Sequence, residues 1–382
     1  MMLFLMGARQ VGKTTVANQI AKNYAKKAYF NWDNDDHRKL IISGQKFIEQ
    51  IFPIQTLGNK PLIIFDELHK YPNWKNYIKG FYDQYKDYYN IIVTGSAHLN
   101  VFQKGGDSLM GRYLPFTVHP LSVGELSQSP LEGILRNPKE ISPEDYDALY
   151  TYGGFPAPYI YREQEGYLQW KRARLSQLFR EDIRDIADVR KLSKLELCAT
   201  LLEFQSGTAL NRSTIANQIQ VSVDTINSWL DVLKQFYYLF TIQPWTTNIP
   251  HSLIKEPKVY LTDWSLVQND GARFETFVAT HLKKSVDYGN ELGKGEYELF
   301  YLRDKKQREV DFLITQNYKP WILVEAKSSE QSISKSLYYY KELTKAPYAF
   351  QVTHKMDYTN QNCFAKEGIY IVPAKTFLSQ LV

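Results

Sequence analysis

The sequence has few of the residues that build disulfide frameworks or zinc sites. Only two of its 382 residues are cysteines, Cys198 and Cys363, and their separation along the chain does not suggest a disulfide framework or a thiolate cluster. The seven histidines form no i, i+4 pair that could bind zinc from one face of a helix. These absences argue against a small disulfide-stabilised protein and favour a reducing, cytoplasmic location.

Long apolar runs and strong charge are also missing. Runs such as residues 62–65 and 91–93 have the length of strands, and none approaches the ~20 residues of a membrane-spanning helix. The first six residues lack the basic start and the length of a signal peptide. A net charge of +5 permits contact with nucleic acid without requiring it. We expect no membrane partner, and a chain long enough to form two or three cores.

The most informative feature that is present is a glycine-bounded loop between an apolar run and a helical pattern. Its sequence, Gly7-Ala-Arg-Gln-Val-Gly12-Lys13-Thr14, matches GxxxxGK[ST], which holds the phosphates of a nucleoside triphosphate. Gly7 and Gly12 allow the tight turn, Lys13 reaches the outer phosphates, and Thr14 offers a hydroxyl to Mg²⁺. A plain glycine turn is the alternative. The expected ATP contacts are Gly7, Ala8, Arg9, Gln10, Val11, Gly12, Lys13, Thr14 and Thr15.

A second motif is a buried strand that ends in two carboxylates. Four apolar residues, 62–65, precede Asp66 and Glu67, and the carboxyl end of such a strand meets the ligand crevice of an open α/β sheet. We expect Asp66 to orient Mg²⁺ through water and Glu67 to polarise the attacking water as a general base. The alternative is that both carboxylates cap the following helix.

Two further motifs add candidate residues around the phosphates. Thr94 and Ser96 follow the apolar run 91–93, and either hydroxyl could sense the γ-phosphate and hold the water. Arg112 could act as an arginine finger that reaches the nucleotide of a neighbouring subunit. A surface salt bridge is the competing interpretation for Arg112.

The middle of the chain has helical patterning and one recognisable supersecondary motif. Residues 210–239 predict a helix, a short turn and a second helix, a helix-turn-helix signature. The second helix carries Asp224 and Asp231 against Lys234, a poor charge balance for a groove lined by phosphates. We therefore favour a packing or lid role over DNA reading.

The last third contains another group of charged residues. Glu325 and Lys327 are two apart in a predicted strand and so share a face, and a neighbouring strand expected to end at Asp311 could bring its carboxylate to Glu325. With Glu275, these residues could bind Mg²⁺ or Mn²⁺ and cleave phosphodiesters. The alternative is a cross-strand ion pair at the rim of a sheet. We expect no robust cleavage, because nothing nearby forms a strongly basic groove.

With these motifs in view, the chain resembles the bacterial and archaeal AAA-type ATPases that join an ATPase core to a C-terminal domain of unknown function similar to PD-(D/E)xK nucleases. The resemblance runs essentially end to end. It is carried by residues 7–15, Asp66-Glu67 with the following residues to Trp74, Thr94-Gly-Ser96, Gly111-Arg112, Pro120-Leu-Ser122, Gly153-Gly-Phe-Pro156, Lys258-Val-Tyr-Leu-Thr-Asp263, Glu309-Val-Asp311 and Glu325-Ala-Lys327.

The resemblance implies an α/β protein with ATP and Mg²⁺ as cofactors. It implies a P-loop ATPase core over residues 1–120, a helical lid over 121–195, a winged-helix-like unit over 196–250 and a PD-(D/E)xK nuclease-like domain over 251–382. DNA and a second copy of the chain, forming a homo-oligomer, are left open as partners.

The chain departs from this family at its beginning. Members generally have a segment before the first strand that helps to enclose the adenine, whereas here the strand begins at Met2. Either the natural chain starts upstream or the base is held loosely. The leading hypothesis is a Mg²⁺-dependent ATPase, and this departure motivates the alternative of a slowly hydrolysing nucleotide switch or DNA-tethering module.

Overall fold

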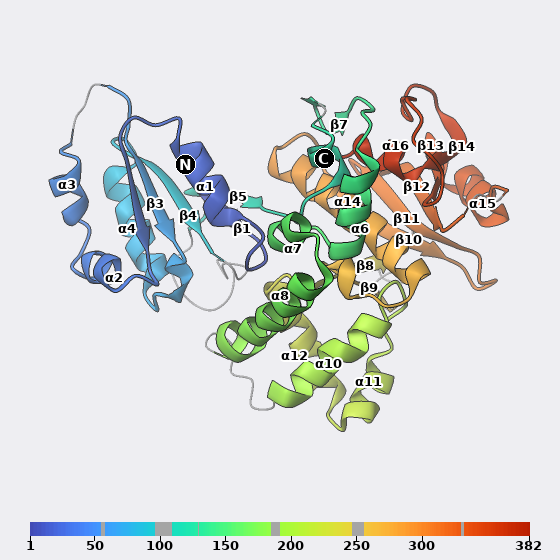
Figure 1. Cartoon of the computed structure of the whole chain (residues 1–382), viewed down its shortest axis with the longest axis horizontal. Helices are drawn as coiled ribbons and strands as arrows, with labels where there is room; N and C mark the ends of the chain where they lie inside the picture. The colour runs from blue at the N-terminus through green and yellow to red at the C-terminus, as the bar shows by residue number, and fades with distance from the viewer. Residues whose placement is uncertain (55–57, 96–108, 129, 185–191, 247–255, 330–331) are drawn as a thin grey trace. The chain divides into compact units, whose positions relative to one another are not determined.

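The computed structural model describes residues 1–54, 58–95, 109–128, 130–184, 192–246, 256–329 and 332–382. They form two compact units, Met1–His119 and Pro120–Val382, in the blue-to-cyan and the green-to-red parts of Figure 1. The first unit ends at His119, whereas the expected ATPase core covers residues 1–120. The segments 121–195, 196–250 and 251–382 all lie in the second unit.

The first unit is built on a sheet in which every strand pair is parallel. The strand order is β2-β3-β4-β1-β5, so β4 lies between β1 and β3. The carboxyl ends of all the strands therefore meet at one edge of this sheet. The strands are β1 (Met2–Met6), β2 (Lys27–Asn31), β3 (Leu62–Asp66), β4 (Asn90–Thr94) and β5 (Tyr113–Thr117).

Helices cover both faces of this sheet, as an all-parallel sheet requires. Helix α1 (Lys13–Ala21) buries Ala17 against a face that includes Ile64. The neighbouring residue, Phe65, points the other way and meets Phe81 of α4 (Trp74–Tyr85), with ring centroids 5.3 Å apart. The alternation along β3 thus explains why its residues are apolar without interruption. The remaining helical segments are α2 (Asp35–Ile42), α3 (Phe47–Ile51) and η1 (Leu68–Lys70).

The second unit begins with helices and contains the expected helix-turn-helix pair. Helices α11 and α12 are capped by Asn211 and Ser222, whose side chains accept hydrogen bonds from backbone N–H groups three residues later. Gln220 makes the turn between them with a φ of 58°. The elements are α5 (Val123–Leu126), β6 (Leu131–Glu132), β7 (Leu135–Arg136), α6 (Pro143–Tyr152), α7 (Pro156–Tyr161), α8 (Gln164–Gln177), η2 (Leu178–Ile183), α10 (Leu192–Phe204), α11 (Arg212–Ile219) and α12 (Val223–Gln235).

A mixed sheet of order β14-β13-β12-β11-β10-β8-β9 completes the second unit (Figure 1). Its main core packs α14 against one face, and α15 packs residues such as Leu337 against the other. The elements are β8 (Leu239–Pro244), β9 (Lys258–Leu261), η3 (Trp264–Leu266), α14 (Asp270–Glu291), β10 (Tyr297–Arg303), β11 (Glu309–Gln316), β12 (Lys319–Lys327), α15 (Lys335–Thr344), β13 (Tyr348–Thr353), β14 (Gly368–Pro373) and α16 (Ala374–Ser379).

One expectation about this sheet is wrong. The strand predicted to end at Asp311 instead begins two residues before it, at Glu309. Strands β11 and β12 are antiparallel, with Phe312 opposite Val324, so the start of β11 lies beside the end of β12. The apolar residues that follow Asp311 continue the strand because they are buried on both faces of the sheet.

The Gly153-Gly-Phe-Pro156 segment forms the expected turn between α6 and α7 and packs against the segment that follows β9. Gly153 has a φ of 84°, and a Cβ there would lie 2.7 Å from Oδ1 of Asp263. The other carboxylate oxygen of Asp263 lies 3.2 Å from Nη1 of Arg174, in a buried ion pair. Two motifs that are far apart in sequence therefore meet around one buried carboxylate.

Candidate functional site

The glycine-bounded loop connects the carboxyl end of β1 to the first turn of α1. Gly12, which precedes α1, has a φ of 109° that favours glycine. Gly7 has a φ of 140°, and a Cβ there would lie 2.3 Å from the backbone oxygen of Val118. Gly7 is therefore required both by its backbone angle and by the chain packed against it.

Lys13 is buried, and its ammonium group is held by the loop itself. Its Nζ donates hydrogen bonds to the backbone oxygens of Gly7, at 3.1 Å, and Ala8, at 2.8 Å. The positive charge thus lies against the loop that the motif predicts to hold phosphates.

Asp66 brings together hydroxyl groups from three other elements. The Oγ1 of Thr14, in α1, lies 3.0 Å from Oδ2 of Asp66. The hydroxyls of Tyr29, in β2, and Thr94, in β4, also donate to this carboxylate. Burial, followed by the bond to Asp66, raises the pKa of Tyr29, so its hydroxyl stays protonated and remains a donor. The result is a compact set of oxygen atoms, the ligand type that Mg²⁺ prefers.

Glu67 directly follows this carboxylate and has an unusual backbone conformation. Its φ is 56°, in the left-handed region that residues with a Cβ seldom adopt. Its Oε2 lies 3.5 Å from Nζ of Lys70, which also forms an ion pair with Asp33 at 2.7 Å. Burial raises the pKa of Glu67, while Lys13 and Lys70 oppose that shift. Strained backbone at the end of a strand is a common feature of functional sites.

The structure places the remaining candidates of the first unit at opposite edges of the sheet. Thr94 lies at the carboxyl end of β4, where its Oγ1 also accepts a hydrogen bond from the backbone N–H of Glu67, at 3.3 Å. Arg112 precedes β5 and forms a two-point ion pair with Asp83, with its Nε 2.8 Å from Oδ1. The edge that holds Arg112 is the amino edge, away from the phosphate loop. Ser96 lies outside the described residues.

Two residues near Glu67 and Asp66 were not identified from the sequence. Tyr29 lies in an edge strand, and nothing in its local pattern marks it as a partner of Asp66. Lys70 is one of many lysines, and the turn after β3 brings it to Glu67. The contact of Tyr29 with Asp66 joins separate strands and leaves no local sequence signal, whereas Lys70 is three residues after Glu67, a spacing that is itself a local signal for an ion pair.

Two of the C-terminal candidates, Glu275 and Asp311, lie around a lysine for which no role is predicted from the sequence, and Glu309 joins them. Lys258 opens β9 and is 3% exposed. Its Nζ lies 2.6 Å from Oε1 of Glu309, 3.1 Å from Oε1 of Glu275 and 3.7 Å from Oδ1 of Asp311. Burial opposes the charge on Lys258, but the three carboxylates outweigh it and raise its pKa. Burial and then Glu275 raise the pKa of Asp311 to about 7.

Glu325 and Lys327 form a pair beside this group. Nζ of Lys327 lies 2.7 Å from Oε1 of Glu325, whereas the intervening Ala326 packs against the main core, as strand alternation predicts. The other oxygen of Glu325 accepts a hydrogen bond from Ser334. In the part of the chain that the structure describes, no group of three or more His, Cys, Asp or Glu side chains is arranged to hold a metal ion.

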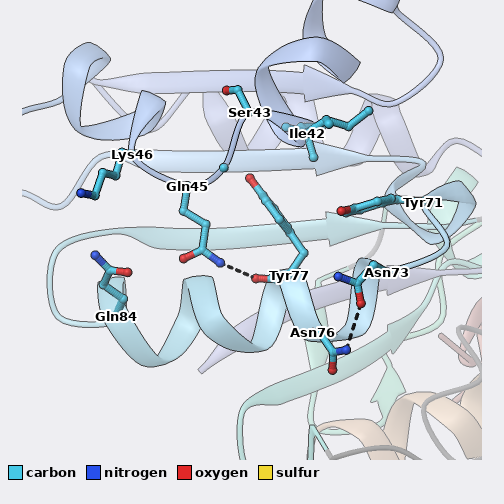
Figure 2. Close-up of a pocket in the computed structure, with 11 residues that line it drawn as sticks. Ile42, Ser43, Gln45, Lys46, Tyr71, Asn73, Asn76, Tyr77 and Gln84 are labelled. Carbon is cyan, nitrogen blue, oxygen red and sulfur yellow. Dashed lines mark hydrogen bonds between the residues drawn. The ribbon is translucent and has the colours of Figure 1, made fainter.

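The first unit also contains a cavity of about 560 Å³ between α2–α3 and α4. Figure 2 shows Gln45 reaching across to Tyr77, and its Nε2 donates to the Tyr77 backbone oxygen at 2.8 Å. The hydroxyl of Tyr77 is buried and finds no hydrogen-bond partner among the residues that the structure describes. Asn73 and Asn76, at the start of α4, add further amides. None of the lining residues belongs to the predicted phosphate contacts, so this polar cavity is separate from them.

Comparison with known proteins divides the chain into three matched segments. The family described as "AAA domain" matches residues 1–127, and two domains of unknown function, DUF8612 and DUF4143, match residues 143–270 and 270–377. The AAA match covers the phosphate loop, Asp66 and Glu67. It supports an AAA-type ATPase domain in the N-terminal unit.

Similar proteins include uncharacterized proteins of an archaeon and a bacterium. One, from Methanocaldococcus jannaschii, is 22% identical over 356 residues, covering 89% of this chain and 78% of the relative. Another, from Mycobacterium tuberculosis, is 21% identical over 350 residues, covering 88% and 72%. Among solved structures, C. elegans PCH-2 is 14% identical with a TM-score of 0.25, covering 61% of this chain and 60% of that one. That score is too low to carry an argument. Among the described helices, none is long and apolar enough to span a bilayer.

Proposed function

We propose that this protein is a Mg²⁺-dependent ATPase of the AAA type. The observation that carries the proposal is the meeting of Thr14, Thr94 and Asp66 beside the loop that holds Lys13. Three motifs from separate strand ends thus contribute to one site. The AAA match over residues 1–127 supports the same function.

Each residue has a role that follows from its chemistry. Lys13 and the loop amides of residues 7–15 bind the phosphates of ATP, with Lys13 exchanging its carbonyl partners for phosphate oxygens. Thr14 and Asp66 would hold Mg²⁺ when it is bound. The bound ion supplies positive charge that stabilises the transferred phosphoryl group. Glu67 polarises the attacking water, and its raised pKa makes it a stronger base when it is ionised.

Thr94 and Arg112 have the two remaining roles. Thr94 lies between Asp66 and the backbone of Glu67, a position suited to orienting the water near the γ-phosphate. Arg112 lies at the other edge of the sheet, so it can act only on the nucleotide of another subunit, as an arginine finger in a homo-oligomer. Its release from Asp83 would be part of that assembly.

A phosphate-release assay tests the role of Glu67. We expect Glu67→Gln to lower turnover by roughly 10²- to 10⁴-fold while ATP binding persists. The matched control is Glu342→Gln, which removes an exposed carboxylate in α15 that pairs with Lys345 at 3.1 Å. Equal turnover in Glu67→Gln and the wild type would remove Glu67 from the mechanism.

A second candidate is a nucleotide switch that hydrolyses ATP slowly. Lys70 lies 3.5 Å from the Glu67 carboxylate and competes with water for it, which favours slow turnover. Single-turnover hydrolysis with tight retention of the product would support this candidate, whereas rapid multiple turnover would exclude it.

The finer domain assignments and the location belong to the same proposal. Residues 121–195 act as a helical lid, and residues 196–250 form a winged-helix-like unit, which the helix-turn-helix pair α11–α12 supports. Residues 251–382 are PD-(D/E)xK-like in fold. We place the protein in the cytoplasm. The winged-helix-like unit is the part that would contact DNA.

A further inference from the structure

The C-terminal carboxylates already surround a positive charge. Glu275 belongs to α14, while Glu309 and Asp311 belong to β11, and all three direct an oxygen to within 3.7 Å of the ammonium of Lys258. Lys258 reaches this point from β9 and is nearly inaccessible to solvent, at 3% exposure. An ion held between separate elements in this way is part of the folded core rather than a surface contact.

The position of Lys258 competes directly with a divalent cation. Mg²⁺ and Mn²⁺ need several oxygens at about 2.0–2.2 Å from one point, and here the shared point among the carboxylates is occupied by the ammonium. A metal ion at that point would have to displace the ammonium, which is buried and has three carboxylate partners. The oxygens also have other donors: Tyr260 donates to Glu275 at 2.7 Å, and the backbone N–H of Ala326 donates to Asp311 at 2.9 Å.

The Glu325-Ala-Lys327 segment does not restore a metal site. The ammonium of Lys327 lies 2.7 Å from one oxygen of Glu325, so a positive charge already neutralises this carboxylate, and Ser334 donates a hydrogen bond to the other oxygen. The residues present therefore do not fit the metal ion that the resemblance to PD-(D/E)xK nucleases implies.

We propose that Lys258 is the permanent internal cation of the Glu275–Glu309–Asp311 cluster, in the place of a metal ion, and that the C-terminal domain does not cleave phosphodiesters by a metal-dependent route. The lysine ties β9, α14 and β11 together, so the cluster serves as a structural joint.

Manganese binding to the full-length chain tests this proposal. Electron paramagnetic resonance counts bound Mn²⁺ in Asp66→Asn, a background that weakens the metal site proposed in the first unit. We expect no stoichiometric site in this background with Lys258 present. Adding Lys258→Ala should vacate the point shared by the carboxylates and create a stoichiometric Mn²⁺ site. The Mn²⁺ affinity should then be at least ~10-fold higher than in Asp66→Asn alone. Adding Glu309→Gln to that variant should abolish the new site.

The matched control is Lys327→Ala. Lys327 forms an ion pair with the single carboxylate of Glu325, so its removal should create no Mn²⁺ site. Stoichiometric Mn²⁺ binding with Lys258 intact, lost on Asp311→Asn, would overturn the proposal, and so would a folded Lys258→Ala variant that binds no Mn²⁺. If circular dichroism shows that Lys258→Ala is unfolded, two measurements on the chain with Lys258 intact still test the proposal. We expect it to bind no stoichiometric Mn²⁺ in the Asp66→Asn background and to show no plasmid nicking in Mn²⁺.

Discussion

Thr14 and Asp66 lie 52 positions apart in sequence, and their side chains are joined by a hydrogen bond of 3.0 Å. Thr14 is in the first turn of α1, and Asp66 is the last residue of β3. Strand β4 lies between β1 and β3 and supplies Thr94 to the same carboxylate. The order of strands thus assembles a single oxygen-rich site from three separate segments.

Replacing the central carboxylate should separate nucleotide binding from its metal dependence. We expect Asp66→Asn to remove most of the gain in ATP affinity that Mg²⁺ provides, because an amide is a weaker ligand and carries no charge. Isothermal titration calorimetry with and without Mg²⁺ measures this difference. Lys13→Ala should weaken binding in both conditions. An unchanged Mg²⁺ effect in Asp66→Asn would place the metal elsewhere.

The first glycine of the loop should be intolerant of any side chain. A Cβ at Gly7 would lie 2.3 Å from the Val118 backbone oxygen, and its φ of 140° disfavours other residues. We expect Gly7→Ala to destabilise the first unit by about 1–3 kcal/mol and to impair ATP binding. Gly44→Ala is the control, since Gly44 also has a positive φ, of 108°, but has nothing within 4 Å of its would-be Cβ. Similar ATP affinities for the two variants would contradict the structure of the loop.

Lys70 should tune the pH dependence of hydrolysis through Glu67. Glu67 acts as a base only when ionised, and the positive charge of Lys70, 3.5 Å from its carboxylate, lowers a pKa that burial raises. Removing that charge in Lys70→Met should raise the pKa of Glu67 further. The acid limb of the pH profile of kcat should therefore move to higher pH.

Lys39→Met provides the control for this experiment, because Lys39 forms an exposed pair with Asp36 on α2. Its profile should match that of the wild type. A shift of the Lys70→Met acid limb to lower pH would mean that Lys70 does not act through Glu67.

His281 should make the second unit less stable in mild acid. Its Nε2 accepts from the backbone N–H of Val123 at 3.0 Å, and its Nδ1 lies 2.7 Å from the backbone oxygen of Phe277. Burial lowers its pKa to about 4. The unfolded chain therefore gains a proton below about pH 6.5 while the folded chain does not, and the free energy of unfolding falls as the pH drops through this window, by about 2 kcal/mol at pH 5.

Denaturant unfolding of the wild type and His281→Gln at pH 7 and pH 5 measures this contribution. Glutamine does not titrate, so the difference in stability between the two pH values should shrink by about 2 kcal/mol. Carboxylates such as Glu125 titrate in both proteins and cancel in the comparison. An identical pH dependence in the two proteins would show that His281 is not held neutral.

Much of the first unit could be predicted locally, because its motifs are continuous in sequence. The glycines of the loop, the apolar strand before Asp66 and the helix after Lys13 each follow from spacing and from residue type. Strand alternation also predicts that the side chains of Glu325 and Lys327 point to the same face of the sheet, and they form an ion pair there. The strand boundary at Asp311 did not, because apolar residues buried on both faces of a sheet give no alternation that marks where a strand begins.

The sequence by itself determined where the GxxxxGK[ST] loop and the Asp66–Glu67 pair lie, since each motif is continuous along the chain. Only the tertiary structure decided which distant side chains meet the carboxylates of the two units: Tyr29 at Asp66, and Lys258 among Glu275, Glu309 and Asp311. A lysine and a metal ion satisfy buried carboxylates by the same attraction. Only the packing of separate elements brings Lys258 to that position.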